Sequence, residues 1–388
     1  MLLTLVTLAL AQQSWTIDDD GPADFADLPA AVAAASDGDI LQLMPGSYTG
    51  TTITKNLKLL GYPPSSFEIP KIGAPGLIVD GSGGGATTFT LTDLRVDDLV
   101  LRNLTARTRV DTATVAGLQV ESCTDVVVTR SYVSDGALPS ASIEVTDSAV
   151  RLTTCNITGG TEASTLDGKA GLALWGDSDV RLAGCVLTGG NVGDAVFSSL
   201  IPGPAIQVVD GAASVTVHGS SYHPIDGGHD PFSSLDSVLT QAPSVEILGG
   251  TLDLSWSAVD FPDAPVPAVS PAEPYLEVGP VGAPLFGPDP TRDLRVFGAP
   301  GDVAAVAIAV GSSTSLPTGF SGESLRVNLD QLVVLELLAL QGQDVPAFVT
   351  VAQPTGPSLS GIELDVQALV ALSGGTSFVT NASQIVLK

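Results

Sequence analysis

Two arginines stand at the same place in neighbouring sequence repeats, where they would suit an anionic ligand. Arg151 and Arg181 each form the centre of a Val-Arg-Leu triplet, and Lys169 lies between them as a further basic group. A guanidinium can bind a carboxylate or sulfate through two parallel hydrogen bonds. The alternative is ion pairing with a nearby aspartate such as Asp147 or Asp179, which is common on protein surfaces. The triplets therefore predict either a substrate-binding site for an anionic sugar chain or two ordinary ion pairs.

The densest polar segment runs from Ser221 to Asp230 and contains two of the three histidines of the chain. His223, Asp226 and His229 have the types needed for acid–base catalysis or for metal binding. Two histidines six positions apart on a Gly-rich stretch match no metalloenzyme spacing. We therefore regard these three residues as catalytic candidates on a loop.

Asp18, Asp19 and Asp20 form a run of carboxylates near the N-terminus. Ca²⁺ prefers oxygen ligands from clustered carboxylates, so the run is a candidate calcium site. The alternative is a solvated acidic turn, because charge runs usually face water. Calcium is the only cofactor that the sequence suggests.

Cys155 and Cys185 occupy one position of the repeat, whereas Cys123 has no partner there. Neighbouring strands lie about 4.8 Å apart, which is within the Cα range of a disulfide. Side chains that stack in register keep their Cβ atoms nearly that far apart, which is slightly long for a bridge. Two alternatives stay open, a Cys155–Cys185 disulfide or a stack of buried thiols.

The elements that must position these groups come from a fourfold repeat between Gly117 and about Tyr222. Each unit has two short strands with alternating apolar and polar residues, which indicates one buried face and one exposed face. The strand pattern is constant while the connection between units lengthens, as in a solenoid with insertions on one side. The inward positions of the first strand are Leu118, Ile143, Leu172 and Ile206, and those of the second are Val126, Val150, Val180 and Val215.

These repeats resemble the right-handed parallel β-helix repeats of secreted bacterial proteins with the pectate-lyase-like architecture. The resemblance covers about Trp15 to Asp260. It implies an all-β solenoid, but lyases, hydrolases, epimerases and adhesins share this architecture. Lyases of this fold use an Arg or Lys base beside acidic groups, a role that the resemblance would give to Arg151, Arg181 or Lys169.

The chain divides into four segments by composition. Residues 1–11 resemble a secretory signal peptide with an apolar run and a small-x-small end. Residues 12–261 form the predicted β-helix, which begins with a capping helix after Asp27. Residues 262–290 are Pro-rich and suit a stiff linker. Residues 291–388 predict a small antiparallel β-sandwich, whose end resembles a C-terminal domain found on many secreted planctomycete proteins.

The net charge of −27 argues against nucleic acid or an anionic membrane as partner, because both require a basic face. No segment is long and apolar enough for a membrane span. We expect a secreted or cell-surface protein without catalytic activity, a matrix or glycan-binding component whose partner is a polysaccharide or cell-surface component. The alternative is a polysaccharide lyase, or less strongly a glycoside hydrolase, that acts on an acidic polysaccharide.

Overall fold

The computed structural model describes most of the chain from Gln12 to Val386. The expected signal segment, His223 and His229 lie outside the described residues. The internal positions that are also not described are 63–68, 135–137, 163–166, 193–200, 220–223, 229–240, 258, 260, 262, 267, 269–272, 280–290, 311, 317–320, 323–324, 328–332, 353–361 and 382.

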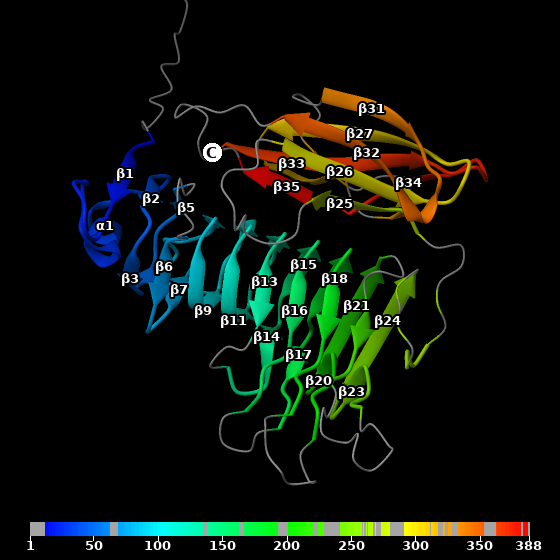
Figure 1. Ribbon diagram of the computed structural model, residues 1–388, viewed down its shortest axis with the longest axis horizontal. Coiled ribbons are helices and arrows are strands. Elements are labelled where there is room, and N and C mark those ends of the chain that lie inside the picture. Colours follow the sequence, from blue (N-terminus) through cyan, green and yellow to red (C-terminus); the bar gives the residue numbers. More distant parts are fainter. Residues whose placement is uncertain are drawn as a thin grey trace, which may run out of the picture.

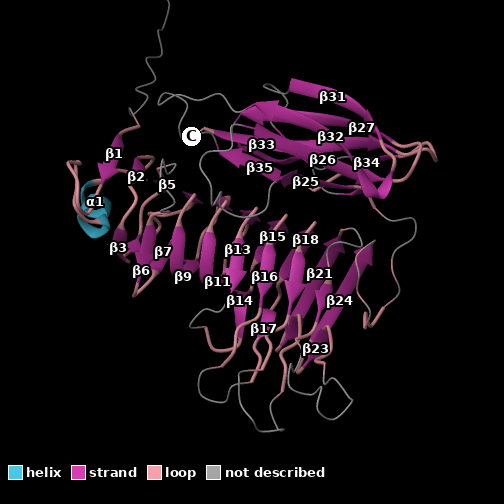
Figure 2. Ribbon diagram, in the orientation of Figure 1, coloured by secondary structure: helices cyan, strands magenta, loops and turns pink. Residues whose placement is uncertain are grey.

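The N-terminal two thirds of the chain form a solenoid of short parallel strands (Figures 1 and 2). One wall of this solenoid is a ten-stranded parallel sheet, in which strands from successive turns of the chain lie side by side. Its strands are, in order, β1 (Ser14–Ile17), β2 (Ile40–Leu43), β5 (Leu57–Gly61), β8 (Phe89–Thr92), β10 (Thr108–Asp111), β12 (Val126–Thr129), β15 (Ala149–Thr153), β18 (Asp179–Ala183), β21 (Ala212–His218) and β24 (Thr251–Ser257).

The remaining walls belong to a second parallel sheet, which divides into two halves at β11 because that strand is long enough to pair in both. One half continues from β11 (Thr114–Glu121) through β13 (Tyr132–Ser134), β16 (Asn156–Thr158), β19 (Val186–Thr188) and β22 (Ile225–Asp226). The other half continues through β14 (Ala141–Thr146), β17 (Ala170–Trp175), β20 (Ile206–Val208) and β23 (Val245–Ile247). The early strands of this sheet are β3 (Ser47–Thr49), β4 (Thr52–Ile53), β6 (Lys71–Gly73), β7 (Leu77–Asp80) and β9 (Arg95–Arg102).

The observed pairing confirms a parallel β-helix and the predicted register of its inward residues. Leu118 pairs with Ile143, which pairs in turn with Leu172. Val126 pairs with Val150, and the same register continues to Val180 on the next strand. These side chains are fully or almost fully buried and form one continuous apolar core. Burial at about 25 cal/mol per Å² of apolar surface is the main force that holds successive turns together.

In the central turns of the solenoid, two of the three corners are made by a single residue in the left-handed backbone region. Such a residue turns the chain sharply from one wall to the next within a short length, although it costs a residue with a side chain about 1–2 kcal/mol. The corner that leads into the ten-stranded sheet uses Asn103, Ser122, Asp147 and Gly176 in successive turns, and the corner that leaves it uses Asp93, Thr112, Arg130, Thr154 and Gly184. The third corner carries the connections that lengthen along the chain.

A short helix, α1 (Leu28–Ala34), covers the N-terminal end of the solenoid (Figure 1). The side chain of Asp27 accepts a hydrogen bond from the backbone N–H of Ala30 at 2.7 Å, which is a standard N-cap. Leu28 and Val32 are buried against the first strands. The predicted capping helix is therefore present. It is the longest helix that the described residues contain, and no helix among them is long and apolar enough to cross a membrane.

The C-terminal part is a β-sandwich with an apolar core shared between two sheets. Its first strand, β25, lies within the segment that we expected to be a linker. One sheet contains β25 (Tyr275–Gly279), β26 (Thr291–Gly298) and β32 (Gly342–Ala352). The other contains β29 (Ser321–Gly322), β34 (Ser377–Val379), β33 (Glu363–Ala371), β27 (Val303–Val310) and β31 (Val333–Ala339), with β35 (Ser383–Val386) beside β33; β28 (Ser312–Leu316) pairs separately with β30 (Leu325–Val327).

The sandwich lies along the outer face of the ten-stranded sheet (Figure 1), where β25 contacts β18 and β35 contacts β10 and β12. Tyr275 and Phe297 stack with ring centroids 4.6 Å apart, and both pack with Ala183 of the solenoid. The backbone N–H of Val278 donates to the hydroxyl of Thr154 at 3.4 Å. This face of the solenoid is therefore a domain interface, whereas the sandwich leaves the face of β14, β17 and β20 uncovered.

Candidate ligand-binding site

Arg151 and Arg181 are paired neighbours on the ten-stranded sheet, as the repeat predicts, and their side chains point outward. They belong to a column of outward residues that also includes further basic groups. Lys58 pairs with Thr90, and Thr90 pairs with Arg109. The sandwich covers this column, which we call the covered face: Lys58, Thr90, Arg109, Val127, Arg151 and Arg181.

Two acidic side chains of β33 neutralise the first part of the covered face. Glu363 accepts a hydrogen bond from the Thr90 hydroxyl at 2.8 Å and forms ion pairs with Lys58 and Arg109. Asp365 is fully buried and lies 3.2 Å from a guanidinium nitrogen of Arg107 and 3.6 Å from one of Arg109. The contacts join residues more than 250 positions apart in the chain, so the sequence analysis did not foresee them.

Both candidate arginines are paired with aspartates. Arg151 is buried and hydrogen-bonds to Asp125, which also accepts from Arg107 at 3.0 Å. Arg181 lies 3.6 Å from Asp179 and is partly exposed near the end of the covered face. The ion-pair interpretation thus describes their geometry, with Asp125 in place of Asp147 as the partner of Arg151.

The other basic and loop candidates lie apart from each other. The ammonium of Lys169 donates to the backbone carbonyl of Leu138 at 2.7 Å, so this side chain helps to hold a connection between turns. Asp226 lies in β22 and accepts a hydrogen bond from the Gln241 side chain. Its proposed partners His223 and His229 lie outside the described residues, and their catalytic role stays a prediction.

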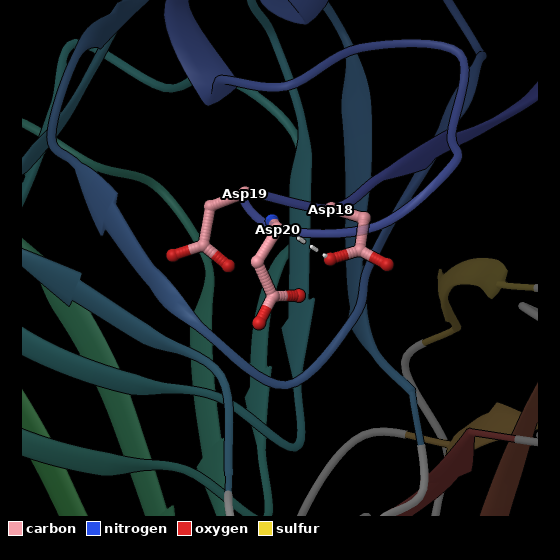
Figure 3. Close-up of side chains that lie close together, drawn as sticks. All are labelled: Asp18, Asp19 and Asp20. Atoms are coloured by element: carbon pink, nitrogen blue, oxygen red, sulfur yellow. Dashed lines mark hydrogen bonds between the residues drawn. The ribbon is translucent and has the colours of Figure 1, made fainter.

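Asp18, Asp19 and Asp20 converge on one turn after β1 (Figure 3), and one oxygen from each lies within 4.8 Å of the others. Carboxylates at this separation would suit Ca²⁺. Asp18 accepts from the backbone N–H of Asp20 at 3.3 Å, and Asp19 accepts from that of Ser47 at 2.9 Å. The first bond lies within the turn, and the second joins the turn to the start of β3. A calcium ion at this turn stays a prediction.

All three cysteines are buried free thiols in the structure. Cys155 and Cys185 stack on adjacent turns, and the backbone N–H of Cys155 lies 3.4 Å from the sulfur of Cys185. Burial raises the pKa of the Cys185 thiol well above its usual value. The structure therefore has the stacked thiols, not the disulfide that the shared column also allows.

The uncovered side of the solenoid carries a cavity of about 380 Å³ on β11, β14 and β17. Its wall combines one aromatic side chain with carboxylates, an amide and a hydroxyl, and contains no basic residue. Mixed lining of this kind is typical of small-ligand sites, in which an apolar surface meets a few fixed polar groups. The residues of this site, which we call the open-face cavity, are Gln119, Glu144, Thr146, Asp147, Trp175, Gly176 and Asp210.

Trp175 is the aromatic surface of the cavity. It points outward at the end of β17 because Leu172 and Leu174 occupy the inward positions of that strand. The ring is half-buried and packs against a patch of small buried side chains that includes Ala173 and Ala170. Small neighbours leave the indole accessible while they fix its position.

Two aspartates from the turns before and after Trp175 are held at the adjoining corner. Asp147 accepts a hydrogen bond from the backbone N–H of Asp177 at 3.0 Å, and Asp210 accepts from that of Gly176 at 2.9 Å. Gly176 has φ of 60°, and a Cβ atom there would lie 2.0 Å from an Asp147 carboxylate oxygen. Glycine at this corner therefore makes room for Asp147 beside the indole.

Glu144 forms the floor of the cavity. Its side chain is buried, and it accepts a hydrogen bond from the backbone N–H of Ser140 at 3.0 Å. Burial raises the pKa of this carboxyl above its usual value, while two backbone hydrogen bonds and the nearby charge of Lys169 act in the opposite direction. A carboxyl of this kind can accept a hydrogen bond or hold a proton near a ligand.

Sequence reasoning placed Glu144 between Gln119 and Ala173, and the pairing confirms these neighbours. It missed the cavity because it compared strand positions alone. Asp147 and Asp210 are corner residues that follow the strands, so they fall outside the alternating pattern. The available signal was their common position at the end of the first strand in each repeat, directly beside the column of Trp175.

Comparisons with known proteins give no family for this chain. No protein-family model matches it, and no curated protein matches it. Pectate lyase Pel9A has a TM-score of 0.32 and 11% identity over 67% of this chain and 82% of its own. The enzymatically active domain of tailspike protein 2 of bacteriophage CBA120 has a TM-score of 0.27 and 10% identity over 92% and 67%.

Proposed function

We propose that the protein is a secreted or cell-surface component that binds a glycan in the open-face cavity. The observation that carries this proposal is the half-buried Trp175 among polar groups on the uncovered face. The apolar run from Leu2 to Leu10 supports export of the chain.

A sugar ring has an apolar C–H face and a rim of hydroxyl groups, so it suits a flat aromatic surface with acceptors around it. The indole of Trp175 offers the surface. Glu144, Asp147 and Asp210 offer acceptor oxygens that backbone hydrogen bonds hold in place. Groups fixed before binding lose little conformational entropy when the ligand arrives, which favours affinity.

The lyase alternative finds no support in the placement of the candidate bases. Arg151 is buried beneath the sandwich and bonded to Asp125, on a different wall from the open-face cavity. Lys169 donates to Leu138, and the cavity wall contains no basic side chain. A binding function needs no such base.

A second candidate function, glycoside hydrolysis, follows from one observation about Glu144. Hydrolysis uses a protonated carboxyl as acid and a second carboxylate on the other side of the bond. Burial raises the pKa of Glu144, and Asp147 and Asp210 line the same cavity. Incubation of each glycan that binds with wild type and Glu144→Gln, followed by separation of the products, tests this function; cleavage by the wild type alone would support it.

The binding function is tested by titration calorimetry with hexasaccharides of glucose, mannose, galactose, N-acetylglucosamine, glucosamine and galacturonate. At least one should bind, and Trp175→Ala should weaken it at least tenfold, because loss of a central aromatic contact costs about 1.4 kcal/mol or more. Tyr132→Ala removes an exposed aromatic side chain from β13 and is the matched control. Equal binding by wild type and Trp175→Ala, or no binding to any hexasaccharide, would contradict the proposal.

A further inference from the structure

We propose that the open-face cavity selects a glycan that carries a protonated amino group, such as an oligomer of glucosamine. This inference rests on the proposed glycan-binding function and names its ligand class. It depends on the charge and on the geometry of the cavity wall.

The charge of the cavity wall has one sign. Three of its seven residues are carboxylates and none is basic. Asp177 adds a further exposed carboxylate next to Gly176. Lys169 is a cation whose charge acts on Glu144, and its ammonium donates to the Leu138 carbonyl. A concave surface with one sign of charge attracts the opposite sign.

Two of these carboxylates accept hydrogen bonds from adjacent backbone N–H groups, those of Gly176 and Asp177. Asp147 and Asp210 come from the turns of the solenoid before and after Trp175, so their backbones lie two strand spacings, about 10 Å, apart with the indole between them. Both are fixed by hydrogen bonds at the corner that directly follows the indole, one to Gly176 and one to Asp177. An ammonium group beside the indole would therefore lie between two carboxylates, where charge-assisted hydrogen bonds and a cation–π contact act together.

Other ligand charges fit this wall less well. A uronate would bring its own carboxylate to Glu144, Asp147 and Asp210, and like charges at this distance repel. A neutral sugar would cover the carboxylates without compensating their charge, which weakens binding. A lysine-rich peptide has the right charge, but its side chain offers the indole no ring-sized apolar face. The amino sugar supplies both the charge and the flat C–H surface.

The test compares hexamers of glucosamine, N-acetylglucosamine and galacturonate with hexalysine at about pH 6 and low salt. The galacturonate hexamer is used with and without Ca²⁺. Glucosamine hexamer should bind at least tenfold more tightly than each of the others. Asp147→Asn and Asp210→Asn should each weaken it about tenfold, and added salt should reduce these differences because it screens charge. Asp253→Asn, which removes an exposed charge from β24, is the matched control and should bind as the wild type does.

The outcomes separate this inference from the proposed function. Equal affinity for the glucosamine and N-acetylglucosamine hexamers, with no effect of either Asn variant, overturns the inference and leaves glycan binding intact. Tighter binding of hexalysine, or of galacturonate with Ca²⁺, also overturns it. No binding of any hexasaccharide overturns the proposed function itself. Circular dichroism of each variant checks its fold, and the salt dependence of the wild type tests the role of charge without any substitution.

Discussion

The covered face and the open-face cavity lie on two walls of the same turns of one solenoid, yet their charges differ in sign and in environment. The covered face carries basic residues that β33 neutralises with Glu363 and Asp365. The open-face cavity carries the buried carboxyl of Glu144 and the corner carboxylates of Asp147 and Asp210 beside Trp175. Charges on the covered face are paired with charges of the same chain, whereas those of the open-face cavity remain available to a ligand.

The difference shows that an outward column of charge in a solenoid is not by itself a binding site. Arg151 and Arg181 stack as a ligand site would require, but a second domain covers that wall. Buried ion pairs cost much when one partner is removed, and exposed charges cost little. Stability measurements can therefore separate the two walls.

The largest effect is expected for Asp365→Ala on the covered face. This change removes a carboxylate that lies 3.2 and 3.6 Å from the buried Arg107 and Arg109. Each arginine keeps one other carboxylate partner, Asp125 or Glu363, so the cost should be about 3 kcal/mol, at the low end for a broken buried pair. Urea unfolding followed by far-UV circular dichroism measures the loss. Asp293→Ala is the matched control, because Asp293 lies 3.9 Å from Arg295 in an exposed pair of the same domain and should cost at most about 1 kcal/mol. Equal losses would show that β33 does not neutralise the covered face.

The sequence was sufficient to predict the solenoid because its repeat states the same burial pattern several times. Each inward column from Leu118 onward was assigned correctly, and so was the helix that begins after Asp27. The docking of the sandwich could not be predicted, since Glu363 meets Arg109 across more than 250 residues without a repeated pattern. The open-face cavity could not be predicted for a local reason. Asp147 and Asp210 are corner residues, and corner residues do not follow the alternation of inward and outward positions in a strand.

A smaller effect is expected at the junction between the domains, where Glu277 of β25 lies against Gly184 of the solenoid. Burial raises the pKa of this carboxyl from 4.5 to about 7, while Arg295 and Tyr275 act in the opposite direction. Because the folded-state pKa is raised, its contribution to stability is full below about pH 4.5 and is lost as the pH rises through about 7.

Glu277→Gln should therefore be more stable than the wild type by about 2–3 kcal/mol at pH 8, and equal to it near pH 4.5. The difference between the two unfolding curves across this range is the measurement. Glu121→Gln, at an exposed position of β11, should keep the wild-type pH profile. A constant difference between Glu277→Gln and wild type at all pH values would exclude the linkage and leave the junction without pH dependence.

On the open face, Gly176→Ala tests whether a glycine next to Trp175 is needed to accommodate the Asp147 side chain. The added Cβ would lie 2.0 Å from the Asp147 carboxylate, and φ is 60°. We expect a loss of about 1–2 kcal/mol in stability and a clear loss of glycan affinity. Gly84→Ala has a similar φ of 73° but meets nothing within 4 Å, so it measures backbone strain alone. Equal stability losses, with unchanged affinity in Gly176→Ala, would show that Asp147 has no role in binding.

The smallest effect on stability is expected for Glu144→Gln at the floor of the cavity. The amide oxygen of glutamine can still accept from the backbone N–H of Ser140, so the change should alter stability by less than about 1 kcal/mol. Burial raises the pKa of Glu144, so its contribution to stability falls as the pH rises, and the Gln variant should gain relative to wild type toward alkaline pH. Urea unfolding at two pH values measures both. A loss as large as that of Asp365→Ala would mean that Glu144 is needed for contacts within the chain, as the charges of the covered face are. The open-face cavity would then not differ from the covered face in having carboxylates available to a ligand.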